Sequence, residues 1–317
     1  NKAQEICSAA QPSVKTAMLS TMQTVDFPWL DTNEYPFAQH WFFVAGHKLH
    51  YIDEGQSDDV LFFVHGTPSW SFDFRHLIKT LSPRYRCIAL DHMGFGLSDK
   101  PIVYDYATPN HAATLQHLIN HLNLRNITLV VHDFGGPIGF HYALHFPENI
   151  RRIVLMNTWL WDASNDPVYQ KTRKFLKSPL LPFLYKYLNF SPRVLLPQSY
   201  ADRKNLSHAV HRQYIRPFSR IRERSGPLAF ANSLLNDQPW FGSMWERIGA
   251  LREKPVLLLW GLKDPFLSKD DLEKWKGAFS TARVVELENA GHFPQDEARE
   301  DVVLAMSHFL KAYPVLP

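Results

Sequence analysis

An aspartate stands at a sharp turn between a strand-like segment and a helix-like segment. In Val130–Gly136 (VVHDFGG), an apolar run ends at His132, and two glycines follow shortly after Asp133. Small residues beside such a turn let the backbone fold tightly and expose one side chain above a sheet, which is the layout of a nucleophile elbow. The usual elbow carries serine between glycines, whereas Val131 replaces the first glycine here. Taken alone, the motif favours Asp133 as a helix N-cap.

Two later motifs change this interpretation. In Trp260–Pro265 (WGLKDP), the carboxylate of Asp264 comes just after an apolar run. In Ala290–Pro294 (AGHFP), His292 lies in the loop after the next such run. The carboxyl ends of parallel strands share one edge of a sheet, so these side chains can converge on Asp133. The order nucleophile, acid, histidine is that of α/β-hydrolases. We therefore expect a catalytic triad, rather than two turn residues and a structural histidine.

The loop His65–Pro68 (HGTP) follows the fully apolar run Val60–Val64. A loop at this place can present a backbone N–H towards the elbow. Together, the N–H groups of Thr67 and Phe134 would form an oxyanion hole. The alternative is a purely structural turn.

The elements that must position these residues alternate along the chain. Strand-length apolar runs separated by helix-like stretches predict βαβ units and a mainly parallel sheet. The expected strands are 49–52, 60–64, 86–90, 127–131, 153–156, 255–260 and 283–287, and the expected helices are 112–119, 139–145, 270–279 and 295–313. Residues 160–245 break this rhythm with eight prolines and apolar groups that lack strand character, so we interpret them as a helical insertion. The predicted organisation is a core of residues 1–157 and 246–317 with a helical cap of residues 158–245.

Composition limits the class of protein. The 317 residues include 45% hydrophobic and 21% charged residues, the balance of a folded globular chain rather than a disordered one. A net charge of +3 is too small to predict nucleic acid or an anionic membrane as the main partner. Two cysteines do not make a disulfide framework, and no apolar run approaches the length of a membrane span. We expect a cytoplasmic protein, with export left open because the chain does not begin with methionine.

With these motifs, the chain resembles haloalkane dehalogenase-type α/β-hydrolases, with epoxide hydrolases as close relatives. The resemblance covers nearly the whole chain outside the insertion, which corresponds to the family's cap. The stretches that carry it are Tyr35–Phe37, His50–Gly55, His65–Phe72, Leu90–Pro101 and His132–Gly136, with Asp264 and His292. It implies an α/β-hydrolase fold with a mostly parallel eight-stranded sheet, flanking helices and a helical cap. It also implies a covalent alkyl ester on Asp133, no metal or organic cofactor, a small apolar substrate, a halide ion as a possible ligand, and a monomer or homodimer.

The chain departs from the family at the halide site. Dehalogenases of this type carry tryptophan after the nucleophile and many carry asparagine after the His-Gly pair, whereas this chain has Phe134 and Thr67. Phenylalanine has no side-chain donor, and threonine has a single hydroxyl. The acid is expected at Asp264, because the alternative position after the preceding strand holds Asn157, with Asp162 as a weaker rival.

Aromatic residues of the insertion and its surroundings are expected to line the substrate pocket. The predicted lining residues are Trp161, Phe175, Tyr214, Trp240 and Phe293. An epoxide hydrolase would also need cap tyrosines to protonate the epoxide oxygen, with Tyr169, Tyr185, Tyr187, Tyr200 and Tyr214 as candidates. Haloalkane hydrolysis is the first expectation. Epoxide hydrolysis, lactone or ester chemistry, and a non-catalytic binding role remain alternatives.

Overall fold

A single eight-stranded sheet runs through the protein. The computed structural model describes residues 27–314, of which those from Asp31 onward belong to one compact unit. The strands follow the order β1-β2-β4-β3-β5-β6-β7-β8 and are parallel except at the β1–β2 and β2–β4 pairs. Their bounds are β1 His40–Val44, β2 His47–Glu54, β3 Val60–Val64, β4 Arg86–Leu90, β5 Ile127–His132, β6 Ile150–Met156, β7 Val256–Gly261 and β8 Arg283–Leu287. The predicted mostly parallel sheet is confirmed, and β1 is a strand that the sequence reasoning missed.

The central strands form where apolar residues follow one another without alternation. All positions of β3, β5 and β7 are buried, because helices cover both faces of the sheet. The edge strand β8 has exposed or half-buried residues at all positions but its last. Such apolar runs hold the sheet in the middle of the core and bring several strand ends to one edge.

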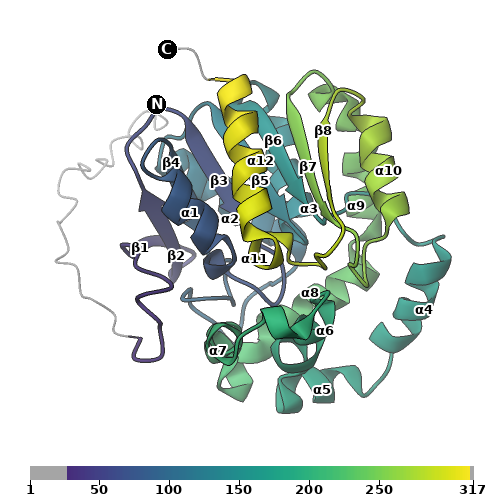
Figure 1. Cartoon of the computed structure of the whole chain (residues 1–317). Coiled ribbons are helices and arrows are strands. Elements are labelled where there is room, and N and C mark those ends of the chain that lie inside the picture. Colours follow the sequence, from purple (N-terminus) through teal and green to yellow (C-terminus); the bar gives the residue numbers. More distant parts are fainter. Residues whose placement is uncertain (1–26, 315–317) are drawn as a thin grey trace, which may run out of the picture. The chain divides into compact units, whose positions relative to one another are not determined.

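Helices cover both faces of the sheet (Figure 1). Helices α1 (Arg75–Leu81) and α12 (Arg299–Ala312) pack together on one face. On the other face lie α2 (Thr108–His121), α3 (Gly135–His145) and α10 (Lys269–Ala278), where Phe140 of α3 stacks on Trp275 of α10. The short α11 (Pro294–Glu297) precedes α12, so the single closing helix predicted for 295–313 is divided at Ala298. None of the helices between residues 27 and 314 has the length and apolar character needed to cross a membrane.

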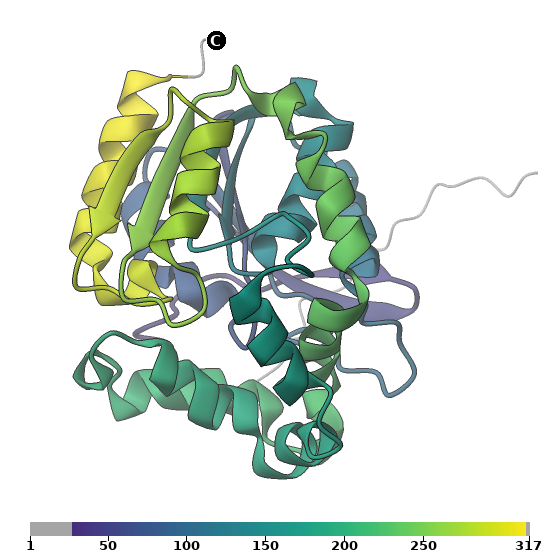
Figure 2. The same cartoon turned by 90° about the vertical axis from the view of Figure 1, so that its right-hand side faces the viewer.

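The segment between β6 and β7 is helical, as predicted, and most of it lies beyond the carboxyl ends of the strands (Figures 1 and 2). Its helices are α4 Pro167–Leu176, α5 Leu181–Leu188, α6 Leu196–Ser199, α7 His208–Ile215, α8 Ser225–Asn236 and α9 Gln238–Trp245. Helix α9 packs along α3 of the core. The division of the chain at residues 157 and 245 stays a prediction. This cap covers the edge of the sheet at which β5, β6 and β7 end.

Candidate active site

Asp133 occupies a strained turn at the carboxyl end of β5. Its φ angle of +51° lies in the left-handed region, which L-residues other than asparagine and aspartate seldom adopt. Helix α3 begins at Gly135, where a Cβ atom would collide with the carbonyl oxygen of Val64. The strand–turn–helix geometry is therefore that of a nucleophile elbow, and it directs the Asp133 side chain away from the helix that follows.

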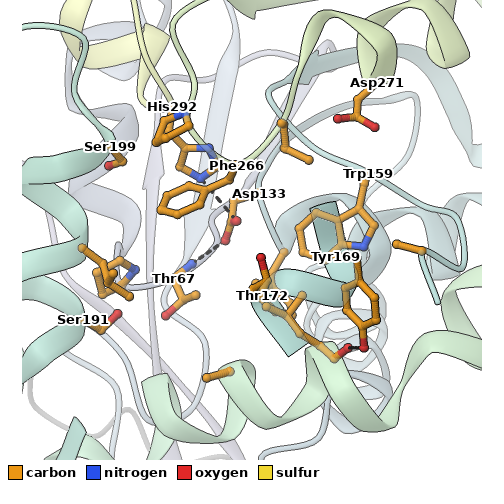
Figure 3. Close-up of a pocket in the computed structure, with 18 of the residues that line it drawn as sticks. Thr67, Asp133, Trp159, Tyr169, Thr172, Ser191, Ser199, Phe266, Asp271 and His292 are labelled. Carbon is orange, nitrogen blue, oxygen red and sulfur yellow. Dashed lines mark hydrogen bonds and ion pairs between the residues drawn. The ribbon is translucent and has the colours of Figure 1, made fainter. Parts of the chain in front are cut away.

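The two carboxylate oxygens of Asp133 have different partners (Figure 3). Oδ1 accepts a hydrogen bond of 2.8 Å from the backbone N–H of Thr67. The N–H of Phe134, the other amide predicted for an oxyanion hole, lies near the carboxylate and helps to lower its pKa. Oδ2 lies 3.3 Å from Nε2 of His292. One oxygen is thus held by one of the amides predicted for an oxyanion hole, while the other faces the imidazole.

The opposite side of the imidazole is held by Asp264. Nδ1 of His292 lies 2.7 Å from Oδ2 of Asp264. The side-chain amide of Asn157 donates to the same Oδ2 at 2.8 Å and is itself held by both backbone groups of Gly261. The weaker rival Asp162 is exposed, and its carboxylate accepts from the N–H of Ser164 instead. The structure therefore brings together Asp133, His292 and Asp264, with Asn157 fixing the acid.

Burial and charge shift the protonation of this cluster in opposite directions. Burial alone would raise the pKa of Asp133, but hydrogen bonding and attraction to His292 outweigh it and lower the pKa of Asp133. Burial alone would lower the pKa of His292, but the carboxylates of Asp264 and Asp133 outweigh it and raise this pKa to about 10. At neutral pH the resting site thus holds an imidazolium between two carboxylates. An imidazolium has no nitrogen free to accept a proton, so His292 can act as a base only after losing one, and loss of a neighbouring negative charge would favour that.

The backbone of the histidine loop is fixed from both the core and the cap. The N–H of His292 donates to the carbonyl oxygen of Ser199 in the cap at 2.9 Å. Its carbonyl oxygen accepts a hydrogen bond of 2.7 Å from Nε2 of His132, whose Nδ1 lies 3.1 Å from Asp73.

A carboxylate ties the same loop to the cap a second time. Glu297 accepts hydrogen bonds from the N–H of Gly291 at 2.8 Å and from the N–H of Ala201 at 2.9 Å. The sequence reasoning missed Asn157, His132 and Glu297 as positioning residues. The only available signal was that His132 directly precedes the nucleophile candidate.

A cavity of about 260 Å³ opens beside Asp133 and His292, between the core and the cap. Its lining is mainly apolar, which suits a small apolar ligand. Of the residues expected to line a substrate pocket, Trp161 and Phe293 lie in the wall of this cavity. The apolar lining consists of Pro68, Phe134, Trp159, Trp161, Ala163, Leu195, Leu196, Ala231, Leu234, Pro265, Phe266, Leu267 and Phe293.

Three residues predicted to line the pocket lie elsewhere. Phe175 is 39% exposed at the end of α4, where its ring contacts Phe190. Tyr214 is buried outside the cavity lining, where its hydroxyl lies 3.1 Å from Oδ2 of Asp296. Trp240 projects from α9 onto His141 of α3.

The tyrosine hydroxyls of the cap are largely engaged. Tyr169 and Tyr185 line the cavity, but the Tyr169 hydroxyl donates to the carbonyl oxygen of Leu234 at 2.6 Å (Figure 3). The Tyr185 hydroxyl lies near Ser191, and burial is the main cause of its raised pKa. Tyr200 donates to Asp296, and Tyr187 is exposed to solvent. No pair of free tyrosine hydroxyls faces Asp133 among the residues that the structure describes.

Phe134 and Thr67, which stand where the family has halide-binding residues, offer few side-chain hydrogen-bond donors. The ring of Phe134 packs against Trp159 and Phe230, with centroid separations of 4.9 and 4.6 Å. The hydroxyl of Thr67 is buried and has no hydrogen-bond partner within residues 27–314. It is thus the one side-chain hydroxyl next to the Asp133 amide donors that remains available.

Comparisons with known proteins agree with this geometry. Residues 59–298 match the family described as alpha/beta hydrolase fold. The chain is 34% identical to "Cis-3-alkyl-4-alkyloxetan-2-one decarboxylase" of Shewanella oneidensis, with 87% of this chain and 89% of the relative covered. It is 32% identical to "Haloalkane dehalogenase 2" of Mycobacterium tuberculosis, with 87% and 96% covered.

Solved structures give the same result. A putative ancestral haloalkane dehalogenase, AncHLD2, superposes with a TM-score of 0.78 at 26% identity, covering 86% of this chain and 99% of that chain. A loop variant of the haloalkane dehalogenase DbeA from Bradyrhizobium elkanii has the same TM-score at 22% identity, covering 87% and 97%, and at that identity it supports the fold alone.

Proposed function

The chain belongs to the α/β-hydrolase fold family and is a hydrolase of the haloalkane dehalogenase type, and we propose that it works through a covalent ester on Asp133. The proposed reaction converts a small haloalkane and water into an alcohol, a halide ion and a proton. One observation carries the proposal: one Asp133 oxygen is bound by the Thr67 N–H, while the other faces His292 beside an apolar cavity. A carboxylate so arranged suits attack on a saturated carbon, because the resulting alkyl ester can be hydrolysed afterwards.

In the first half of the reaction, Oδ2 of Asp133 attacks the carbon that bears the halogen. A carbon–oxygen bond forms as the carbon–halogen bond breaks, and the bonding pair leaves with the halide. The low pKa of Asp133 keeps its carboxylate ionised for this step. The protonated His292 balances the negative charge during the attack.

In the second half, water hydrolyses the ester. Ester formation removes the negative charge of Asp133, so the pKa of His292 falls and its proton is released to solvent. Nε2 of His292 then accepts a proton from water, whose oxygen attacks Cγ of Asp133. The negative charge develops on Oδ1, which already accepts the hydrogen bond from the N–H of Thr67, and the N–H of Phe134 lies beside the same carboxylate. On collapse, the bond between Cγ and the alkoxide oxygen breaks. The alkoxide takes the second proton of the attacking water, which releases the alcohol and restores the carboxylate beside a protonated His292.

The departing halide would be bound by fewer donors than in typical members of the family. Phe134 offers no side-chain N–H, so we assign the leaving-group hydrogen bond to the unpartnered hydroxyl of Thr67. Loss of one such donor costs about 3 kcal/mol, or about a hundredfold in rate. Bromides and iodides, which need less stabilisation on leaving, should therefore react faster than chlorides.

Opening of a strained lactone is the second candidate. Two relatives, from Shewanella oneidensis and Xanthomonas campestris, bear the name cis-3-alkyl-4-alkyloxetan-2-one decarboxylase at 34% and 32% identity. When Asp133 attacks an alkyl carbon of such a ring, the leaving oxygen belongs to a carboxylate of the same molecule, which lessens the need for halide donors. Epoxide opening is supported less well, since the hydroxyl of Tyr169 already donates to the carbonyl oxygen of Leu234.

The decisive experiment traps the ester. His292→Ala should stop at the first half of the reaction, so incubation with 1-iodohexane should give an alkyl adduct on Asp133 by intact and peptide mass spectrometry. The double variant Asp133→Asn with His292→Ala is the matched control and should give none. Halide release, hydrolysis of an aryl epoxide and loss of carbon dioxide from a cis-dialkyl oxetanone, measured with the parent chain, separate the substrate classes. If no substrate gives an adduct or turnover, the proposal is wrong.

A further inference from the structure

The positive charge of the chain is concentrated in the cap. Residues 158–245 contain 13 lysines and arginines and five acidic residues, a net charge of +8, although the whole chain carries only +3. Between Asp166 and Asp202 there are six basic residues and no acidic one. The near balance of the total charge, which argues against an anionic partner, therefore conceals a strongly basic region beside an acidic remainder.

Helix α5 carries an apolar face on each of two opposite sides. Leu181 and Tyr185 point inward and pack with residues of α4 and α8. Leu180, Phe183 and Tyr187 lie on the opposite side at helical spacing, with exposed fractions of 62%, 51% and 59%. The rings of Phe183 and Tyr187 stack on each other at a centroid separation of 5.2 Å. In Figure 1, α5 lies at the end of the cap that is farthest from the sheet.

Cationic side chains occur on α5 and on the segments just before and after it in the chain. Lys171, Lys174, Lys177, Lys186 and Arg193 are exposed, and none of them forms an ion pair with a residue between 27 and 314. The basic segment 216–224 adjoins α5, because Arg224 donates to the carbonyl oxygens of Lys186 and Tyr187. We call Leu180, Phe183 and Tyr187 with the cations around them the cap face.

We propose that the cap face docks on the surface of an anionic phospholipid bilayer. Leucine and aromatic side chains enter the boundary between headgroups and acyl chains, while lysine and arginine pair with lipid phosphates. The unpaired cations between Lys171 and Arg193 have no acidic residue among them, so they match a uniformly negative surface better than the mixed charges of a typical protein partner. A second copy of the chain is disfavoured, because pairing two cap faces would bring like charges together.

Docking would place the substrate cavity close to the lipid. Tyr169 and Thr172 of α4 and Tyr185 of α5 line the cavity from the inner side of the same helices. A substrate dissolved in the bilayer would then reach the cavity without crossing bulk water. This consequence rests on the proposed function, whereas docking itself does not.

Vesicle flotation with the full chain tests the proposal. The parent chain should float with vesicles of phosphatidylcholine mixed with phosphatidylglycerol, but not with phosphatidylcholine alone, and high salt should release it. Each basic residue near an anionic surface contributes about fivefold to binding, so Lys174→Glu with Lys177→Glu should weaken it at least about tenfold. Phe183→Ser with Tyr187→Ser should do the same through lost apolar insertion. Leu304→Ser and Lys311→Glu, which change exposed residues of α12, are the matched controls and should bind as the parent does.

Three results would overturn the proposal: no binding of the parent chain to either vesicle, binding that both cap-face variants retain, or a dimer of the parent that Phe183→Ser with Tyr187→Ser dissociates. The last would assign the face to a second copy. Turnover of a short, water-soluble haloalkane should be unchanged in the cap-face variants. An absence of turnover in the parent would refute the proposed function and leave the flotation result unaffected.

Discussion

Replacing Gly66 by alanine should disable Asp133 while leaving the fold intact. A Cβ atom at Gly66 would lie 2.5 Å from Cγ of Asp133, whereas two such carbons need about 3.5 Å, so the carboxylate must move by about 1 Å. A displacement of that size costs about a hundredfold in rate, and loss of a single oxyanion donor costs about 10²- to 10³-fold. The φ of Gly66 lies outside the left-handed region, so the substitution introduces a side-chain clash rather than backbone strain. Overpacking of this kind costs about 1–3 kcal/mol of stability.

The assay measures kcat from halide release, with thermal unfolding to count the folded fraction. We expect Gly66→Ala to lower kcat, calculated per folded molecule, by about 10²- to 10³-fold. Gly277→Ala in α10 is the matched control, because a Cβ there meets nothing within 4 Å. That variant should keep the parent kcat and gain about 0.5–1 kcal/mol of stability. A folded Gly66→Ala chain with kcat within about threefold of the parent would refute the role given to the Thr67 amide and the Asp133 carboxylate.

Three further outcomes follow from the site. Phe134→Trp supplies an N–H donor, so release of chloride from 1-chlorohexane should accelerate by up to about a hundredfold and release of iodide from 1-iodohexane far less; equal gains for both substrates would contradict this. Asn157→Leu removes the amide that fixes Asp264 and should lower kcat by about tenfold or more, measured by halide release at matched folded fraction; an unchanged kcat would contradict the positioning role. The raised pKa of His292, about 10, makes its charged form stabilising below its unfolded pKa of about 6.5, and this contribution is lost as the pH rises through about 10. The stability advantage of the parent over His292→Gln in chemical denaturation should therefore shrink between those pH values, and an advantage that grew with pH would contradict it.

The residues that converge on the site could be predicted because sheet topology constrains them strongly. Fully apolar runs mark β3, β5 and β7 as buried strands, and parallel strands must end at a common edge. Polar residues just beyond such runs, such as Asp133 and Asp264, must therefore lie at that edge. This reasoning needs only the ends of the strands, which are well marked in the sequence.

The cavity walls could not be predicted in the same way. Which side of a cap helix faces the cavity depends on packing between helices, and aromatic residues occur on both sides. Phe175 and Trp240 point away from the cavity for this reason, whereas Tyr214 is held by a carboxylate from a distant helix. The edge strand β1 was missed although four of its residues, Trp41–Val44, are apolar; unlike the central strands it is not buried.

Residues that hold the site in place left the weakest signal. Asn157 and Glu297 bind carboxylate or backbone groups that are close in the fold but distant in the sequence. Single amide and acid side chains of this kind occur throughout any chain. Only the hydrogen bonds themselves distinguish them from ordinary loop residues.

The hydrogen bonds from the histidine loop to Ser199 and, through Glu297, to Ala201 limit how this protein can be re-engineered. A chimaera that takes its cap from another member of the family would also exchange the cap residues that support the loop of His292. Grafts that preserve the backbone of residues 199–201 should keep His292 in place, whereas grafts with a junction inside that stretch would change the cavity wall and the position of His292 together. When the cap is exchanged, the position of the junction should therefore be chosen with respect to residues 199–201, at the end of α6, and not only by the ends of the insertion.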